Sequence, residues 1–184
     1  MALKATIFKA KLQIANMERN YYGDHAVTLA RHPSETDERL MVRLLAFCLH
    51  ADPALSFGKG LSTLEEPDLW LKDLTGEIKL WIDAGQPEDK LVRRACGRAE
   101  SVFIYCYGAR ATTWWQKTEG VLARCDNLTV INLAAADTQA LAALVRPRMD
   151  LSCTIEDGQA LVANGECSVR VEIHTLKQAH AVLQ

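Results

Sequence analysis

The sequence predicts an α/β protein of the α+β kind, in which a central α-β-β-β-α-β segment lies between an N-terminal β-hairpin and a C-terminal three-stranded β-meander. Two observations lead to this fold class. Apolar residues alternate in some stretches, as in strands, and recur three and four positions apart in others, as in helices. Glycine-containing turn signals separate these stretches. We expect a single domain over residues 1–184, with its core at residues 34–107.

The composition is that of an ordinary folded protein. Hydrophobic residues make up 49% and charged residues 24% of the 184 residues, which is close to globular averages. A net charge of -2 argues against a polycation that coats nucleic acid or anionic lipid without selectivity. No run approaches the ~20 apolar residues of a membrane span, so we expect a cytoplasmic protein without membrane contact.

Neither cysteine nor histidine forms a recognisable metal motif. The six cysteines include no CxxC pair and have mostly apolar neighbours, which predicts reduced core residues. The five histidines lack the spacing of zinc ligands. We therefore expect no zinc.

The N-terminal region predicts a hairpin followed by a helix. Residues 8–14 alternate between apolar and polar, and "HAVTLARH", residues 25–32, is expected to be the partner strand. In "PSETDERLMVRLLAFCLH", residues 33–50, the apolar period changes to that of a helix, with Ser34 as its expected N-cap. Glu38 falls on the inward edge of this helix, near its core face.

Three strands are expected next, around "ALSFGKG" and over residues 68–74 and 77–84, with Thr75-Gly76 as a two-residue turn between the last two. Pro87 is the expected first residue of a helix. "SVFIYCYG" then has the continuous apolar character of a strand buried on both faces. A strand, a helix and a strand in this length predict a right-handed parallel crossover.

The remainder of the chain predicts two helices around one strand, and then the meander. The helices are expected within residues 111–126 and 136–147, and the strand at "LTVINL". Three strands follow, joined by two-residue turns at Asp157-Gly158 and Asn164-Gly165.

The predicted hairpin of residues 68–84 brings two acidic residues together. With a two-residue turn, Trp70 faces Trp81 and Asp68 faces Asp83. This register also sets Lys72 against Lys79, which counts against it. The stretch Glu77-Ile78-Lys79 has the written form of a nuclease signature, but it falls near the turn, about 20 Å along the strand from Asp83. We therefore expect it to be a solvated strand end.

Two facing carboxylates repel each other unless one is protonated or a cation lies between them. This favours a hard divalent ion, Mg²⁺ or Mn²⁺, bound by Asp68 and Asp83. The alternative is that Asp68 caps a turn after Pro67 and Asp83 caps the helix that opens at Pro87. In that case the pair has no chemical role.

Four stretches carry a family resemblance. "HPSETDER", "EEPDLW", "LWIDAGQP" and "ACGRAE" resemble the bacterial YaeQ family along essentially the full chain. The element order and the opposed acids also resemble the PD-(D/E)XK nuclease superfamily. This resemblance implies a restriction-endonuclease-like mixed sheet, with Asp68 and Asp83 matching the two acidic positions of the motif and Glu38 matching its helical glutamate.

The lysine of the superfamily motif has no match, because Gly85 stands two residues after Asp83. Gln86 could orient a water molecule in its place, or Lys90 could reach back from the next helix. A basic stripe on that helix, which includes Lys90, Arg93 and Arg94, could contact phosphates or be a solvated face.

We therefore expect a metal-dependent nuclease that acts through Glu38, Asp68, Asp83 and Gln86. The alternative is a noncatalytic regulatory protein of the same fold that binds nucleic acid or a protein partner. The sequence predicts no particular oligomeric state.

Overall fold

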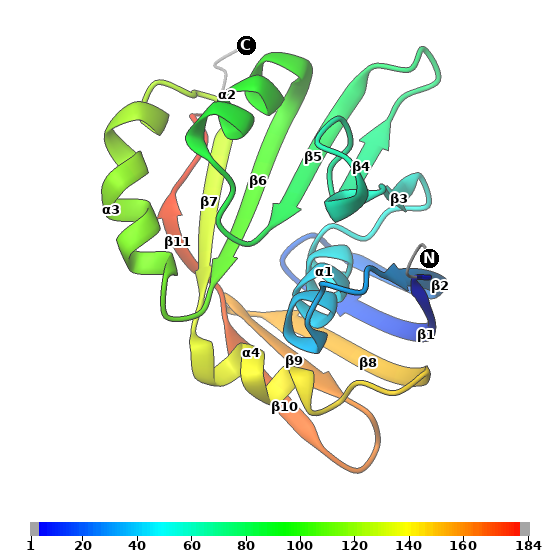
Figure 1. Cartoon of the computed structure of the whole chain (residues 1–184). Helices are drawn as coiled ribbons and strands as arrows, with labels where there is room; N and C mark the ends of the chain where they lie inside the picture. The colour runs from blue at the N-terminus through cyan, green and yellow to red at the C-terminus, as the bar shows by residue number, and fades with distance from the viewer. Residues whose placement is uncertain (1–3, 181–184) are drawn as a thin grey trace. The chain divides into compact units, whose positions relative to one another are not determined.

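The structure is a computed structural model that describes residues 4–180 (Figure 1). Residues 1–3, which precede the predicted first strand, lie outside the described residues. The chain folds into two compact units. The first unit contains the chain up to Ala51 and returns for Ala134–Ile173, and the second contains Asp52–Leu133 and the chain from His174.

The first unit is built on a five-stranded sheet with the order β10-β9-β8-β1-β2. The β1–β8 pair is parallel and the other neighbours are antiparallel. Helix α1 contacts α4 and β1, and α4 contacts β10. The elements are β1 (Thr6–Asn16), β2 (Tyr21–Arg31), α1 (Asp37–Leu49), α4 (Ala135–Ala142), β8 (Arg148–Glu156), β9 (Gln159–Ala163) and β10 (Ser168–Glu172).

The period-2 pattern of β1 buries one face of this sheet. Phe8, Ala10, Leu12 and Ile14 are all buried, whereas the residues between them are exposed or only partly buried. Residues 40–49 of α1 are buried as well. The predicted N-terminal hairpin and the predicted helix are thus confirmed.

Two local predictions in this unit are wrong. The N-cap of α1 is Thr36, whose side chain accepts a hydrogen bond from the backbone N–H of Arg39 (3.1 Å), while Ser34 bonds to the His32 ring. The connection from β9 to β10 has four residues, 164–167, because Ala163 pairs with Ser168. Asp157-Gly158, by contrast, is the predicted two-residue turn, with positive φ at both residues.

The second unit is built on a six-stranded sheet with the order β11-β7-β6-β5-β4-β3. Strands β5, β6 and β7 are parallel, and the outer pairings are antiparallel. The elements are β3 (Leu55–Phe57), a 3₁₀ turn (Gly60–Ser62), β4 (Leu69–Lys72), β5 (Ile78–Ala84), α2 (Asp89–Arg98), β6 (Ala99–Tyr107), α3 (Ala111–Leu122), β7 (Leu128–Leu133) and β11 (His174–Lys177).

The parallel connection from β5 through α2 to β6 confirms the predicted crossover. Helix α2 begins at Asp89 rather than at Pro87, and Glu88 is its N-cap. The core of this unit contains Trp81, Val102, Ile104 and Leu128, and Trp114 and Trp115 pack against it. Strand β11 is not among the predicted elements, because the sequence pattern of the tail indicates a three-stranded meander alone.

The predicted α-β-β-β-α-β order is present from α1 to β6. The described residues form two mixed sheets, and the strands of the predicted hairpin and meander make up the first of them. Helix α1 belongs to the first unit and β3 to β6 belong to the second. The restriction-endonuclease-like arrangement of these elements stays a prediction.

Candidate functional site

The register of β4 and β5 determines where the acidic residues lie. Leu69 pairs with Ile82 and Trp70 pairs with Trp81, which confirms the predicted alignment. The indole rings of Trp70 and Trp81 are in edge contact, with centroids 6.2 Å apart. Such cross-strand aromatic pairs stabilise a specific register.

At its turn, the hairpin differs from the predicted two-residue connection. A register shift after Leu71 places Lys72 opposite Ile78, so the repulsive pairing of Lys72 with Lys79 does not occur. The Asp73 carboxylate accepts hydrogen bonds from the backbone N–H groups of Thr75 (2.8 Å) and Glu77 (3.0 Å) and thereby closes the turn.

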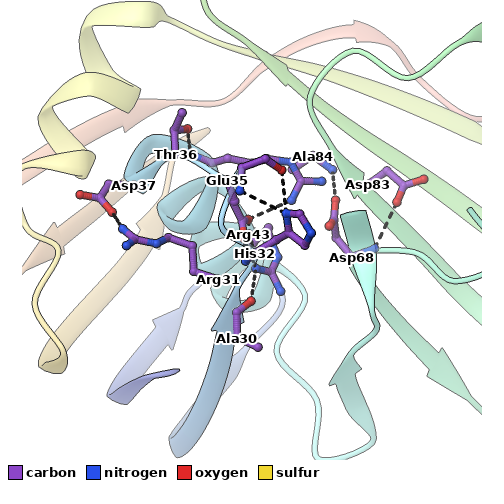
Figure 2. Close-up of polar contacts among 12 residues, drawn as sticks. Ala30, Arg31, His32, Glu35, Thr36, Asp37, Arg43, Asp68, Asp83 and Ala84 are labelled. Atoms are coloured by element: carbon purple, nitrogen blue, oxygen red, sulfur yellow. Dashed lines mark hydrogen bonds and ion pairs between the residues drawn. The ribbon is translucent and has the colours of Figure 1, made fainter. Parts of the chain in front are cut away.

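The two aspartates are held beside each other at the open end of this hairpin (Figure 2). The backbone N–H of Asp68 donates to Oδ1 of Asp83 (3.1 Å), and the backbone N–H of Ala84 donates to Oδ2 of Asp68 (2.8 Å). The Trp81 indole N–H donates to Oδ2 of Asp83 (2.8 Å). Asp68 is 1% exposed and Asp83 is partly exposed. Hydrogen bonds from neighbouring strands therefore orient both carboxylates.

A glycine-containing loop encloses Asp68. The N–H of Gly58 donates to the carbonyl oxygen of Asp68 (2.9 Å), and the N–H of Gly60 donates to that of Pro67 (3.3 Å). A Cβ atom at Gly60 would lie 2.5 Å from Oδ1 of Asp68, and one at Gly58 would lie 2.2 Å from the Pro67 oxygen. Gly60 also has a φ of 48°. Larger residues would therefore displace this loop from Asp68.

The Glu77-Ile78-Lys79 stretch lies near the turn of the hairpin, as predicted, and Glu77 and Lys79 belong to an ion cluster there. The Lys79 ammonium lies 3.2 Å from Glu77, 3.0 Å from Glu100 and 3.5 Å from Asp73. Hydrogen bonding to Glu100 is the largest of the causes that raise the pKa of Lys79. This lysine is engaged with the carboxylates around the turn.

Gln86 and the loop before it are tied to β6. The backbone N–H of Gly85, with a φ of 106°, donates to the Tyr105 carbonyl oxygen (2.8 Å). The Gln86 amide Nε2 donates to the Tyr107 carbonyl oxygen (2.5 Å). Gln86 follows Asp83 closely in sequence, but its amide nitrogen is committed to the end of β6.

The predicted basic stripe of α2 is exposed, and two of its arginines are paired with acids. Arg93 contacts Asp89 (3.2 Å) one turn earlier. Arg94 contacts Glu65 (2.5 Å), while Lys90 is exposed. Phosphate binding at Arg94 would therefore compete with the Glu65 carboxylate.

Glu38 lies in the first unit, whereas Asp68 and Asp83 lie in the second. Its Oε1 accepts a hydrogen bond from the hydroxyl of Thr138 on α4 (2.5 Å). Thr138 is fully buried and Glu38 is partly buried, which agrees with the predicted position at the inward edge of α1.

The first unit contains a buried ion pair that the sequence pattern did not predict. Glu35 is 7% exposed and Arg43 is 4% exposed. Nη1 of Arg43 lies 3.1 Å from both oxygens of Glu35 and donates to the Ala30 carbonyl oxygen (3.3 Å) (Figure 2). Arg39 contacts Glu35 as well (2.9 Å). The signal in the sequence was the single cation inside the apolar run "LMVRLLAFCL", because charged residues are rarely buried without a partner.

Within residues 4–180, no three His, Cys, Asp or Glu side chains gather closely enough to hold a metal ion. The six cysteines are free thiols, and Cys167 is exposed, contrary to the predicted core position. Burial raises the pKa of Cys106 to about 12. Burial and the neighbouring Cys125 thiol together raise the pKa of Cys96 to about 12.

None of the described helices is long and apolar enough to cross a membrane.

These features define the molecule as an α+β protein with two mixed sheets and an orientated pair of aspartates on the β4–β5 hairpin. The profile of the family described as "YaeQ protein" matches residues 1–173. The chain belongs to the YaeQ family.

Relatives and solved structures agree with this assignment. The chain is 39% identical to the uncharacterized protein YaeQ of Salmonella typhi over 97% of this chain and 99% of the relative. The YaeQ protein of Escherichia coli K12 is 38% identical over the same shares. The crystal structure of YaeQ from Xanthomonas axonopodis pv. citri superimposes with a TM-score of 0.91 at 48% identity, covering 94% of this chain and 98% of that one. The YaeQ structure from Pseudomonas syringae gives a TM-score of 0.91 at 29% identity, with coverages of 95% and 97%.

Proposed function

We propose that Asp68 and Asp83 together bind one Mg²⁺ or Mn²⁺ ion and that the protein hydrolyses phosphodiester bonds of nucleic acid. The observation that carries this proposal is the position of the two carboxylates at the open end of one hairpin. Each of them accepts a hydrogen bond from a backbone N–H on the opposite side of the hairpin. Two adjacent negative charges attract a cation. Carboxylate oxygens completed by water are the ligands that Mg²⁺ prefers.

The residues of the chain would have separate roles in this reaction. Asp68 is held rigidly from two sides, by the Ala84 N–H and by the loop containing Gly60, so its position changes little on ion binding. A bound divalent ion would activate a water molecule and stabilise negative charge on the phosphate. Gln86, whose Nε2 is anchored to β6, would present its Oε1 as an acceptor that orients this water.

A noncatalytic role is the second candidate, and two specific observations favour it. Gly85 occupies the position of the motif lysine, so no cation stands two residues after Asp83. The hydrogen bonds from the Asp68 N–H to Asp83 and from the Ala84 N–H to Asp68 also hold the two strands of the hairpin together by themselves. On this alternative the protein binds nucleic acid or a protein partner and regulates it.

Metal titration followed by thermal unfolding tests the ion site. We expect Mg²⁺ or Mn²⁺ to raise the Tm of the natural protein and of the control Asp126→Asn, whose exposed side chain belongs to the loop before β7. Asp83→Asn should show no increase. An ion at 100 times its Kd stabilises the native state by about 2.7 kcal/mol. Equal increases in all three proteins would exclude the proposed site.

Nuclease activity is tested separately with labelled single-stranded DNA, duplex DNA and RNA in the presence of Mn²⁺. We expect the natural protein to cleave at least one of these and Asp68→Asn to lose the activity. Cleavage of equal rate in both proteins would assign it to a contaminant. Metal-dependent stabilisation without cleavage of any substrate would favour the noncatalytic alternative.

A further inference from the structure

The outer face of the five-stranded sheet carries a groove that the proposed function does not use. Its volume is about 530 Å³. Because Ala10 and Leu12 of β1 are buried on the inner face, Lys9 and Lys11 point to the outer one. The lining residues come from three adjacent strands: Lys9, Ala10 and Lys11 of β1, Ala26, Val27 and Thr28 of β2, and Arg148, Met149 and Asp150 of β8.

Three cations gather in this groove. Lys9 and Arg148 are direct neighbours across the parallel β1–β8 ladder, and Lys11 follows two residues after Lys9, about 6.6 Å along the strand. On the other side, Lys9 pairs with Thr28 and Lys11 pairs with Ala26, which are uncharged. Lys9 and Arg148 therefore repel each other at facing positions, an arrangement that strands normally avoid.

The cations of the groove are not neutralised by the protein. Within residues 4–180, neither lysine nor Arg148 lies within ion-pair distance of a carboxylate. Asp150 is the one acid among the described lining residues, and it stands beside Lys11 in the ladder. The groove thus has an excess of positive charge on a chain whose net charge is -2.

We propose that this groove binds the sugar–phosphate backbone of a nucleic acid strand, with phosphates contacting Lys9, Lys11 and Arg148. The regular spacing of cations along β1 and across to β8 suits a polymer with repeated phosphate charges. The small side chains of Ala26 and Thr28 leave the floor accessible. A single nucleic acid strand can enter a concave surface of this kind, whereas a flat membrane surface would not reach the floor of the groove. Because the contacts are to phosphate, binding is independent of sequence.

The groove is independent of the aspartate pair, which lies in the other unit. Binding is therefore measured in EDTA, so that a failure of the proposed metal site leaves the result unchanged. The probes are short fluorescent DNA and RNA oligonucleotides, and the readout is anisotropy at several salt concentrations.

The decisive variant is Lys9→Gln/Lys11→Gln/Arg148→Gln. Its matched control is Arg110→Gln/Lys117→Gln/Arg124→Gln, which removes three exposed cations of the second unit. We expect the control to bind as the natural protein does, and the groove variant to bind at least tenfold more weakly at low salt. The slope of log Kd against log salt should fall by about 2 to 3, since each phosphate contact contributes about 0.7 to 0.9.

A second variant keeps the test independent of folding defects. Asp150→Asn removes the acid next to Lys11 and should tighten oligonucleotide binding severalfold. The proposal is overturned if the natural protein does not bind any oligonucleotide, or if the groove variant and the control bind equally. It is also overturned if the groove variant loses binding only to vesicles of anionic lipid or to an acidic peptide.

Discussion

At the scale of single residues, the buried Glu35–Arg43 pair is the most consequential feature of the first unit. It links the segment after β2 to the middle of α1, because Arg43 contacts Glu35 and the Ala30 carbonyl oxygen together. Removing one partner of a buried pair leaves an uncompensated charge, which costs more than the pair itself contributes.

Glu35→Ala should therefore lower the free energy of unfolding by about 3 to 5 kcal/mol. Urea unfolding at neutral pH measures this change. The control Glu166→Ala alters an exposed loop residue and should change stability by less than about 0.5 kcal/mol. Equal effects of the two variants would contradict a stabilising role for the buried pair.

His50, at the C-cap of α1, should make the stability of the protein depend on pH. Burial, assisted by the nearby charge of Arg19, lowers its pKa to about 3. Between its ordinary pKa of about 6.5 and that value, the unfolded chain binds a proton that the native state does not. Stability is therefore fully present above the ordinary pKa and falls as the pH decreases, by up to about 1.4 kcal/mol per pH unit from this group.

Urea unfolding at several pH values between about 7 and about 4 tests this histidine, a range set by its ordinary and lowered pKa. We expect His50→Gln to lose less stability on acidification than the natural protein. The exposed His174→Gln should retain the natural pH dependence. If His50→Gln and the natural protein follow parallel curves, His50 does not cause the acid sensitivity.

At the scale of elements, side chains near turns determine where helices and hairpins begin. The sequence pattern predicted Ser34 as the N-cap of α1, but the hydroxyl of Thr36 is the one that accepts from the Arg39 N–H. Similarly, Asn164 Oδ1 accepts from the backbone N–H groups of Glu166 and Cys167, which extends the expected two-residue turn to four residues. Local hydrogen bonds that compete with regular secondary structure explain both differences.

Because Thr36 caps α1, Thr36→Ala should lower the free energy of unfolding by about 1 kcal/mol, the usual cost of losing an N-cap. Ser34→Ala serves as the matched control and should cost less than about 0.5 kcal/mol. Thermal unfolding of both variants provides the comparison. A larger loss in Ser34→Ala would mean that the helix begins earlier than the structure shows.

At the scale of the whole molecule, neither compact unit is a continuous segment of the chain. The chain passes between the units after Ala51, Leu133 and Ile173. Its last described strand, β11, joins the six-stranded sheet beside β7. Leu176 packs against the core of that unit, and the Lys177 ammonium donates to the carbonyl oxygens of Cys125 (2.8 Å) and Leu128 (3.1 Å).

Deleting the chain after Ile173 should therefore destabilise the second unit more than the first. Hydrogen exchange is the appropriate measurement, because it reports the local opening free energy of each strand. We expect faster exchange in β6 and β7, with much smaller changes in β1 and β8. Uniform acceleration across both sheets would show that the two units unfold together.

The sequence by itself determined the alternation of β1, the α-β-β-β-α-β order and the Trp70–Trp81 register that brings Asp68 to Asp83. The first two features depend on residues close in the chain, where backbone geometry couples side-chain period to element type, and the edge contact of the two indole rings favours the third. Only the tertiary structure decided the β1–β8 pairing and the passage of β11 into the other sheet. Each of these features joins segments that are far apart in the chain, and their contact depends on which apolar surfaces are buried together. Because hydrophobic burial is non-directional, the local pattern of a strand does not specify which strand lies beside it.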